Sequence, residues 1–267
     1  YLEWRGQEKD FDDTILNRAE ILLLLSAWPT AYVLWQWAGA EAGAGRFRTG
    51  ALAVIAVAVV VIMIGVSNSN QLAALVALVG AVFAAFTGKW LQKLLAGLVV
   101  IGFLAAPLLP TTVLAPERWA ASFDEKHYSA LHRLHIWNFA AQRITDAPVI
   151  GWGLDAARRI PGGDTKLAGG GNVMSVHTHN GSLQIWLELG AVGALIFAGL
   201  LAALWLRIAI LEERSLRAGG TGLLLSALMV ANLSFGIWQT WWMASLALSG
   251  LLFMIAQKLK LDERLNI

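Results

Sequence analysis

The residues best suited to chemistry gather in one short polar stretch, residues 176–181. His177 and His179 stand two positions apart there, and Asn180 follows them directly before an apolar segment that starts near Leu183. An imidazole with an ordinary pKa near 6.5 suits proton transfer at neutral pH. The free N–H groups at a helix start favour an anion such as phosphate. The stretch predicts either an anion site with a histidine base or two histidines that cap a helix at a wet interface.

An amide and a carboxylate continue this polar character into the apolar segment. Gln184 and Glu188 are four residues apart and share one face of a helix. A carboxylate inside a membrane is costly unless it is paired or faces a cavity. We expect Glu188 to contact the substrate or orient the base, or else to pair with a loop arginine. Because the chain has no cysteine and the histidines have no third ligand at zinc-like spacing, we expect no metal and no cofactor.

Arginines supply the cations that a phosphate-bearing substrate needs. Arg133 and Arg143 lie on a predicted amphipathic helix, and Arg18 opens the first apolar segment. A planar guanidinium can bind two phosphate oxygens at once. The alternative for Arg18 is a charge that snorkels at the end of a span. Arg158 and Arg159 are predicted to be an ordinary solvated pair, with a phosphate clamp as the alternative.

The composition places these residues in a membrane protein. Of the 267 residues, 57% are hydrophobic and 14% are charged, whereas a soluble domain has about 45–50% and about 25%. The net charge of +2 and the lack of a Lys/Arg run argue against a nucleic-acid partner. We expect an all-α polytopic bundle embedded in membrane lipids, with Pro29 and Pro107 interrupting the first and the fourth of its spans. Because a span needs roughly 20 apolar residues, the predicted spans are Ala19–Ala38, Gly50–Val66, Gln71–Phe86, Leu94–Leu109, Leu183–Leu206, Gly220–Trp238 and Trp241–Gln257.

Charge placement orients the spans. When alternate loops are placed on the same side of the membrane, that side receives half of the 20 basic residues, and they lie in short loops. The positive-inside rule assigns this side to the cytoplasm. Residues 110–182 then form a long periplasmic loop, which contains the amphipathic helix Tyr128–Thr145, ended before Pro148. Residues 1–109 hold an outer N-terminal segment and four spans, and 183–267 hold three spans and a cytoplasmic tail. An odd number of spans with an external N-terminus suggests that earlier helices precede this chain.

Four short strings resemble one family. His179-Asn180, nine further residues and Gly190-x-x-Gly193 resemble the hallmark of the O-antigen ligase/polymerase superfamily, which is His, then Asn, Ser or Gln, nine residues and Gly-x-x-Gly. Three further strings resemble patterns of the same family. Asn17-Arg18 resembles its Asn-Arg helix start, and Arg133-x-x-Ile136-Trp137 resembles its Arg-x-x-(Ile/Leu)-Trp. Pro148-x-x-Gly151-x-Gly153 resembles its Pro-x-x-Gly-x-Gly. The order of the strings agrees with the family over nearly the whole chain.

One stretch departs from the family. Many relatives have a Ser-Arg pair at the turn that here reads Ser67-Asn68-Ser69-Asn70, where Asn70 is the predicted N-cap of the next helix. If that arginine binds pyrophosphate in the relatives, Arg18 or Arg143 is expected to replace it here.

The resemblance implies a bacterial inner-membrane glycosyltransferase of the C-type fold. Such an enzyme moves O-antigen glycan from a polyprenyl-pyrophosphate donor to lipid A–core at the periplasmic face, without a metal. His179 holds the family position of the general base, so it is preferred over His177. The expected substrate-binding residues are Arg133, Arg18, Arg143, His177, Asn180 and Glu188. The alternatives are a polymerase of the same superfamily and a non-enzymatic transporter subunit, which the scarcity of charges deep in the spans disfavours.

Overall fold

The chain is an all-α, multi-pass membrane protein, as the composition predicts. The computed structural model describes residues 13–37, 44–123, 128–167 and 171–265. Within these ranges the chain folds into helices and turns, with one isolated bridge between Lys166 and Asn172. Among the described residues, stretches long and apolar enough to cross a membrane lie in five helices: α2 (Ala44–Ile64), α3 (Asn68–Phe86), α7 (Gly181–Ala209), α8 (Arg214–Leu233) and α9 (Thr240–Leu265).

The first and the fourth predicted spans are helices that fall outside this group. They are α1 (Asp13–Trp37) and α4 (Trp90–Ala105). The 16 residues of α4 reach only about 24 Å at 1.5 Å per residue, against a hydrocarbon core of about 30 Å. Pro29 lies inside α1 as predicted, whereas Pro107 lies beyond the end of α4 and does not interrupt it. The predicted end of the first span at Ala38 is outside the described residues.

The boundaries of α8 differ from the prediction. The helix begins at Arg214 instead of Gly220 and ends at Leu233, before Trp238. Arg217 is therefore part of the helix, where it is only 6% exposed, and not part of a short loop. The predicted span covered only the apolar part of the helix. Arginine and serine, which precede that part, also adopt helical conformation, so the helix begins earlier.

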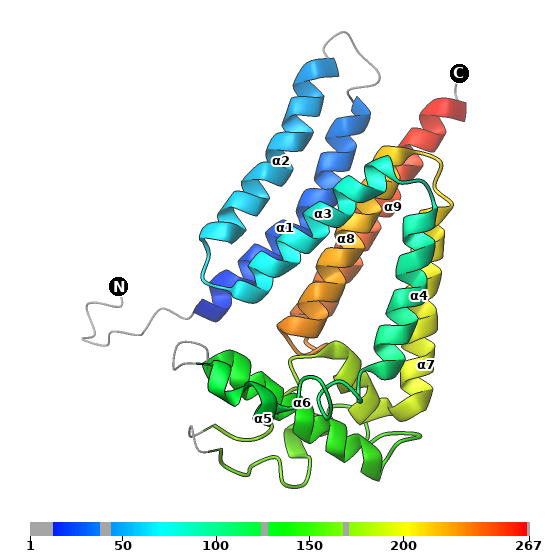
Figure 1. The fold of residues 1–267 in the computed structure, drawn as a ribbon. Coiled ribbons are helices and arrows are strands. Elements are labelled where there is room, and N and C mark those ends of the chain that lie inside the picture. Colours follow the sequence, from blue (N-terminus) through cyan, green and yellow to red (C-terminus); the bar gives the residue numbers. More distant parts are fainter. Residues whose placement is uncertain (1–12, 38–43, 124–127, 168–170, 266–267) are drawn as a thin grey trace, which may run out of the picture. The chain divides into compact units, whose positions relative to one another are not determined.

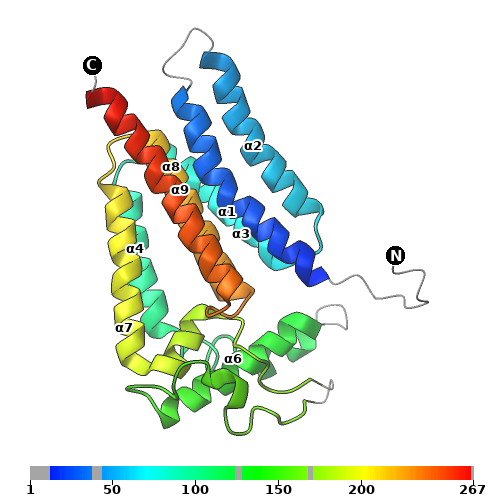
Figure 2. The ribbon, with the colours of Figure 1, turned by 180° about the vertical axis from the view of Figure 1, so that it is seen from behind.

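The first of two compact units falls within residues 1–85, 213–230 and 244–267. It contains α1, α2, α3 and most of α8 and α9, and α1 runs beside α2 (Figures 1 and 2). Trp28 of α1 packs against Ala77 and Ala81 of α3. Its indole Nε1 donates a hydrogen bond to Ser226 Oγ of α8 at 2.9 Å, so a polar contact also joins these helices.

A buried polar cluster ties the start of α3 to α1 in this unit. The Ser67 hydroxyl accepts a hydrogen bond from the Asn70 N–H at 3.4 Å, so Ser67 and not Asn70 caps α3. Asn70 is fully buried, and its Nδ2 donates to the Asn17 carbonyl at 3.1 Å and to Glu20 Oε2 at 2.7 Å. Asn17 is thus held in place, while the neighbouring Arg18 is exposed on α1.

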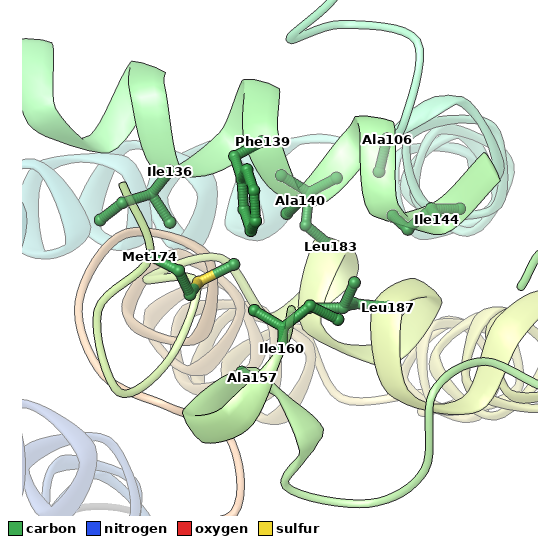
Figure 3. Close-up of a cluster of buried hydrophobic side chains, with 10 residues drawn as sticks. All are labelled: Ala106, Ile136, Phe139, Ala140, Ile144, Ala157, Ile160, Met174, Leu183 and Leu187. Carbon is green, nitrogen blue, oxygen red and sulfur yellow. The ribbon is translucent and has the colours of Figure 1, made fainter. Parts of the chain in front are cut away.

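The second unit falls within residues 86–212 and 231–243. It contains α4, α5 (Pro116–Trp119), α6 (Tyr128–Asp146), α7 and the short 3-10 helices η2 (Ala120–Ser122) and η4 (Ala156–Arg159). Both α4 and α6 pack against α7 (Figures 1 and 2). The predicted amphipathic helix is α6, which ends before Pro148 as expected. Its apolar face meets α7 and the following loop in a buried cluster (Figure 3) of Ala106, Ile136, Phe139, Ala140, Ile144, Ala157, Ile160, Met174, Leu183 and Leu187.

Candidate functional site

The helix that follows the histidines is broken, whereas the sequence predicted one continuous span over Leu183–Leu206. Gly190 has φ 61° and ψ −158°, a backbone conformation that is essentially confined to glycine. It divides α7 into residues 181–189 and 191–209. The second segment alone reaches about 28 Å at 1.5 Å per residue, close to the thickness of a hydrocarbon core. Glu188 therefore lies on the short first segment, next to the break.

Residues 148–153 supply the hydrogen bonds that the break removes. In an unbroken helix the N–H groups of Ala191 and Val192 would donate to the carbonyls four residues earlier. Instead, four backbone hydrogen bonds of 2.8–3.2 Å join the two segments, from Trp152 to Leu187, Gly153 to Glu188, Ala191 to Pro148 and Val192 to Val149. We call residues 148–153 and 187–192 the clasp. The Pro-x-x-Gly-x-Gly and Gly-x-x-Gly strings are thus two halves of one structural element.

Two glycines allow this close approach of backbones. A Cβ at Gly190 would lie 2.4 Å from the Val149 carbonyl carbon, and a Cβ at Gly151 would lie 2.4 Å from the Glu188 carbonyl carbon. Gly151 also has a positive φ of 70°. Any other residue at either position would push the two segments apart.

His179 is held by a main-chain carbonyl that also sets its tautomer. Its Nδ1 lies 2.6 Å from the Ser234 oxygen. Because a carbonyl oxygen can only accept, Nδ1 carries the proton, and the neutral ring keeps an unprotonated Nε2. The backbone of His179 has φ 54°, a left-handed conformation that needs support from its surroundings. Its ring is therefore oriented by the chain after α8 and not by Glu188.

His177 has the opposite tautomer. Its Nδ1 accepts a hydrogen bond from the His179 N–H at 3.2 Å, so the proton of the neutral ring is on Nε2. The two rings lie 4.1 Å apart between centroids. A Cβ at Gly236 would lie only 2.9 Å from His177 Cβ, so this glycine lets the ring pack closely. Of the two histidines, only His179 presents an Nε2 able to accept a proton.

Burial keeps both rings neutral. Burial and the charge of Arg133 together lower the pKa of His179 to about 4, against the opposing bond to Ser234. Burial also lowers the pKa of His177 to about 3, with further contributions from His179 and from the charges of Arg158 and Arg133. These electrostatic effects mean that Arg133 lies close enough to act on both imidazoles. Burial lowers the pKa of Arg133 as well, in its half-buried position on α6.

The Arg-x-x-Ile-Trp string explains how α6 brings Arg133 to the histidines. Trp137 Nε1 donates to the Thr178 carbonyl at 2.9 Å, between the two histidines in the chain. Arg133 lies one turn before Trp137 on the same face of the helix. Asn180 completes the segment, because its side chain accepts the Leu183 N–H at 3.0 Å and caps α7.

Glu188 is fully buried, and its hydrogen-bond donors are neutral groups. Oε1 accepts from Gln184 Nε2 at 3.2 Å. Oε2 accepts from the Asp155 N–H at 3.0 Å and from Trp238 Nε1. No ion pair with a loop arginine is formed among the described residues, so that alternative is wrong. The carboxylate thus joins α7 to Asp155 and to Trp238, two segments distant in the chain.

Arg143 and Arg18 are the two remaining predicted arginines. Arg143 is ten residues beyond Arg133, or about 15 Å along the helix axis. It pairs with Asp146 at 3.1 Å and stacks on Phe139 with its guanidinium 5.2 Å from the ring centroid. Arg18 belongs to the first compact unit. The structure thus brings together His177, His179, Asn180 and Arg133, and the roles of Arg18 and Arg143 in binding stay predictions.

Three groups of this site were missed by the sequence. The Ser234 carbonyl and the Asp155 N–H are main-chain atoms, which no residue type announces. Trp238 belongs to the tryptophan-rich stretch 237–242, and such a stretch is more often an aromatic belt at the membrane interface. The only local signal was the buried carboxylate of Glu188, four residues after Gln184, because a carboxylate in an apolar segment needs polar partners. Trp238 is one of these partners.

Comparison with known proteins agrees with this geometry. Residues 44–198 match the family described as O-antigen ligase. The chain belongs to the O-antigen ligase family. The matched region includes α6, the clasp and the histidine segment, so three of the four family strings fall on the residues that build the site.

Among curated proteins, members of the same family in Rickettsia are similar to this chain. Proteins named "Putative polysaccharide ligase" are 30% identical over 188 residues in Rickettsia conorii and 30% over 171 residues in Rickettsia prowazekii. These matches cover 67% and 62% of this chain but 45% and 41% of the relatives. The chain therefore spans about half the length of the curated relatives it matches. No solved structure matches the chain at a significant level.

Proposed function

We propose that this O-antigen ligase family member transfers a glycan from a polyprenyl-pyrophosphate donor to lipid A–core, at the periplasmic face of the bacterial inner membrane. The observation that carries the proposal is the bond from His179 Nδ1 to the Ser234 carbonyl. It leaves Nε2 as the basic atom of a neutral ring, beside the charge of Arg133. A base next to a guanidinium suits a reaction in which a hydroxyl attacks and a diphosphate leaves.

In the proposed reaction, His179 Nε2 removes the proton from the acceptor hydroxyl as its oxygen attacks the anomeric carbon. The bond from that carbon to the pyrophosphate oxygen breaks, and the negative charge that develops on the diphosphate is stabilised by Arg133. One in-line displacement inverts the anomeric carbon. It requires no covalent intermediate on the protein.

Donor binding would also tune the base. A pKa of about 4 makes His179 a weak base. Part of that lowering comes from Arg133, and a bound diphosphate would offset this positive charge. The pKa of His179 would then rise toward neutral pH once the donor is in place. Base strength would be greatest when the leaving group is bound.

The contacts favour different roles for the remaining predicted residues. We propose that Glu188 positions Trp238 and the Asp155 loop and does not touch the substrate. His177 and Asn180 would hold the backbone of His179, through the Nδ1 acceptor and the helix cap. Arg18 and Arg143 stay candidates for further donor contacts.

The test is transfer in vitro by purified protein in nanodiscs, with a lipid-linked glycan donor and lipid A–core. We expect His179→Ala to lower the rate about 10²–10⁴-fold, as for a lost general base, while donor binding persists. His177→Ala should be milder, and His135→Ala, on the same unit, is the matched control. Equal losses for His179→Ala and His135→Ala would reject the base assignment. Elongation of a second lipid-linked repeat in place of transfer to lipid A–core would identify a polymerase.

A further inference from the structure

A basic cavity of about 840 Å³ lies in the second unit, formed mainly by the loop between η4 and the histidine segment. Arg158, Arg159 and Lys166 line it, and Asp164 is the acidic residue among its lining side chains. Arg158 is bound to Asp155 at 2.8 Å, whereas Arg159 and Lys166 form no ion pair within the described ranges. The cavity therefore carries an excess of positive charge. Its volume is within the range of small-ligand sites, about 300–1,000 Å³.

The cavity has walls fixed by backbone hydrogen bonds. The Val173 N–H donates to the Thr165 carbonyl at 2.8 Å, and the Met174 N–H donates to the Gly163 carbonyl at 3.0 Å. Met174 and Ile160 anchor this wall in the hydrophobic cluster under α6 (Figure 3). These bonds fix the backbone of the loop that carries the exposed side chains of Arg159 and Lys166.

An amide oxygen in the wall calls for a hydrogen-bond donor. Asn172 Oδ1 is buried and accepts no hydrogen bond from the part of the chain that the structure describes. The Asn172 carbonyl is held separately, by His132 Nε2 of α6 at 2.7 Å. A ligand that satisfies both the amide and the cations needs a hydrogen-bond donor, such as a hydroxyl group, and an anionic group. A sugar that bears a phosphate or a carboxylate has both, whereas a lipid chain has neither.

The cavity adjoins the histidines. Ser175 and Val176, which line it, lead directly into His177, and Ser175 Oγ donates to the His177 carbonyl at 2.5 Å. The charge of Arg158 also contributes to the lowered pKa of His177. A saccharide bound in the cavity would therefore reach toward the base.

We propose that this cavity binds an anionic sugar of the acceptor glycolipid, held by Arg159 and Lys166 and by a hydroxyl donated to Asn172. The inference rests on the proposed function, because it names the acceptor chemistry of the same site. It assigns the cavity to the acceptor, whereas Arg133 serves the donor.

The test measures binding of glucose 6-phosphate, glucuronate, neutral glucose and inorganic phosphate to the full chain in phosphatidylcholine nanodiscs at low salt. We expect at least about tenfold tighter binding of the anionic sugars than of glucose. The Arg159→Gln/Lys166→Gln double variant should abolish that difference, and the Arg118→Gln variant, at an exposed cation of α5, should keep it. The tighter of the two anionic sugars identifies phosphate or carboxylate as the anion recognised.

Several outcomes would overturn the inference. Equal binding of glucose and the anionic sugars removes the basis for a charged ligand. Equal losses in the double variant and in Arg118→Gln assign the effect to general surface charge. If inorganic phosphate binds as tightly as glucose 6-phosphate, the cavity does not recognise the sugar. If the sugar is recognised, the Asn172→Ala variant should bind glucose 6-phosphate more weakly.

Transfer assays separate this inference from the proposed function. The double variant should raise the KM for lipid A–core at least about tenfold with little change in kcat and in donor binding. An unchanged acceptor KM in an enzyme that still depends on His179 would reject the cavity assignment and keep the proposed function. Absence of transfer by the wild-type protein, with intact discrimination between anionic sugars and glucose, would reject the proposed function and the acceptor role of the cavity but keep the cavity as a site for an anionic sugar.

Discussion

Replacing Gly190 by alanine tests whether the clasp holds the broken helix together. Gly190 has φ 61° and ψ −158°, and a residue with a Cβ costs about 1–3 kcal/mol in such a conformation. The added Cβ would also lie 2.4 Å from the Val149 carbonyl group, so the two backbones must separate. Each of the four clasp hydrogen bonds contributes about 0.5–1.5 kcal/mol net. If all four break, the Gly190→Ala variant loses about 3–9 kcal/mol of stability.

Thermal unfolding and hydrogen exchange in detergent measure this loss. At about 2 °C per kcal/mol, the Tm should fall by at least about 6 °C, and the amides of Trp152 and Gly153 should exchange faster. Gly199→Ala is the matched control, because it lies on the same helix and a Cβ there meets nothing within 4 Å. Alanine at that position should leave the Tm unchanged or slightly higher. If Gly190→Ala and Gly199→Ala unfold at the same temperature with both amides still protected, the clasp does not carry the stability assigned to it.

Four further predictions concern the site and its orientation. Arg133→Lys should lose much of the transfer activity, because an ammonium cannot bind two phosphate oxygens at once; a rate equal to wild type would exclude Arg133 as the diphosphate ligand. Because the pKa of His179 is lowered to about 4, the acidic limb of kcat/KM should lie well below pH 6.5, and a limb at 6.5 or above would contradict the assignment. Trp137→Phe removes the bond to the Thr178 carbonyl and should cost about 0.5–1.5 kcal/mol in unfolding together with a lower transfer rate, whereas a change in neither would show that α6 does not position the histidines. A cysteine introduced at Thr165, in a chain with no other cysteine, should react with an impermeant maleimide added from the periplasmic side; reaction only after membrane permeabilisation would invert the topology.

The lowered pKa values of the two histidines also predict a pH dependence of stability. In the unfolded chain both histidines bind a proton below about pH 6.5. In the folded chain His177 binds one only below about pH 3, and His179 only below about pH 4. Stability should therefore fall as the pH drops from 6.5 toward 4, by up to about 1.4 kcal/mol per pH unit for each histidine. Denaturant unfolding of the wild type and of His177→Gln over this range measures the slope. A variant slope as steep as that of the wild type would refute the contribution of His177.

The sequence by itself determined the features that depend on local spacing. The long apolar stretches predicted helices long enough to cross a membrane, because lipid requires an unbroken run of apolar residues. The three- and four-residue spacing of Leu134, Trp137 and Ala141 predicted α6 nearly to the residue, and Pro148 predicted its end. The family strings located Arg133 and His179, since a string of residues is itself a local pattern.

Only the tertiary structure decided how these residues are held. The break at Gly190 was invisible, because the apolar stretch continues through it and the bonds that stabilise it come from residues 148–153. The tautomers of His177 and His179 depend on the Ser234 carbonyl and on a main-chain N–H, which carry no side-chain signature. The partners of Glu188 come from 33 and 50 residues away, as well as from Gln184 on its own helix. The contact of the His179 ring with the main chain of Ser234, 55 residues away, therefore distinguishes the two histidines, which spacing alone could not do.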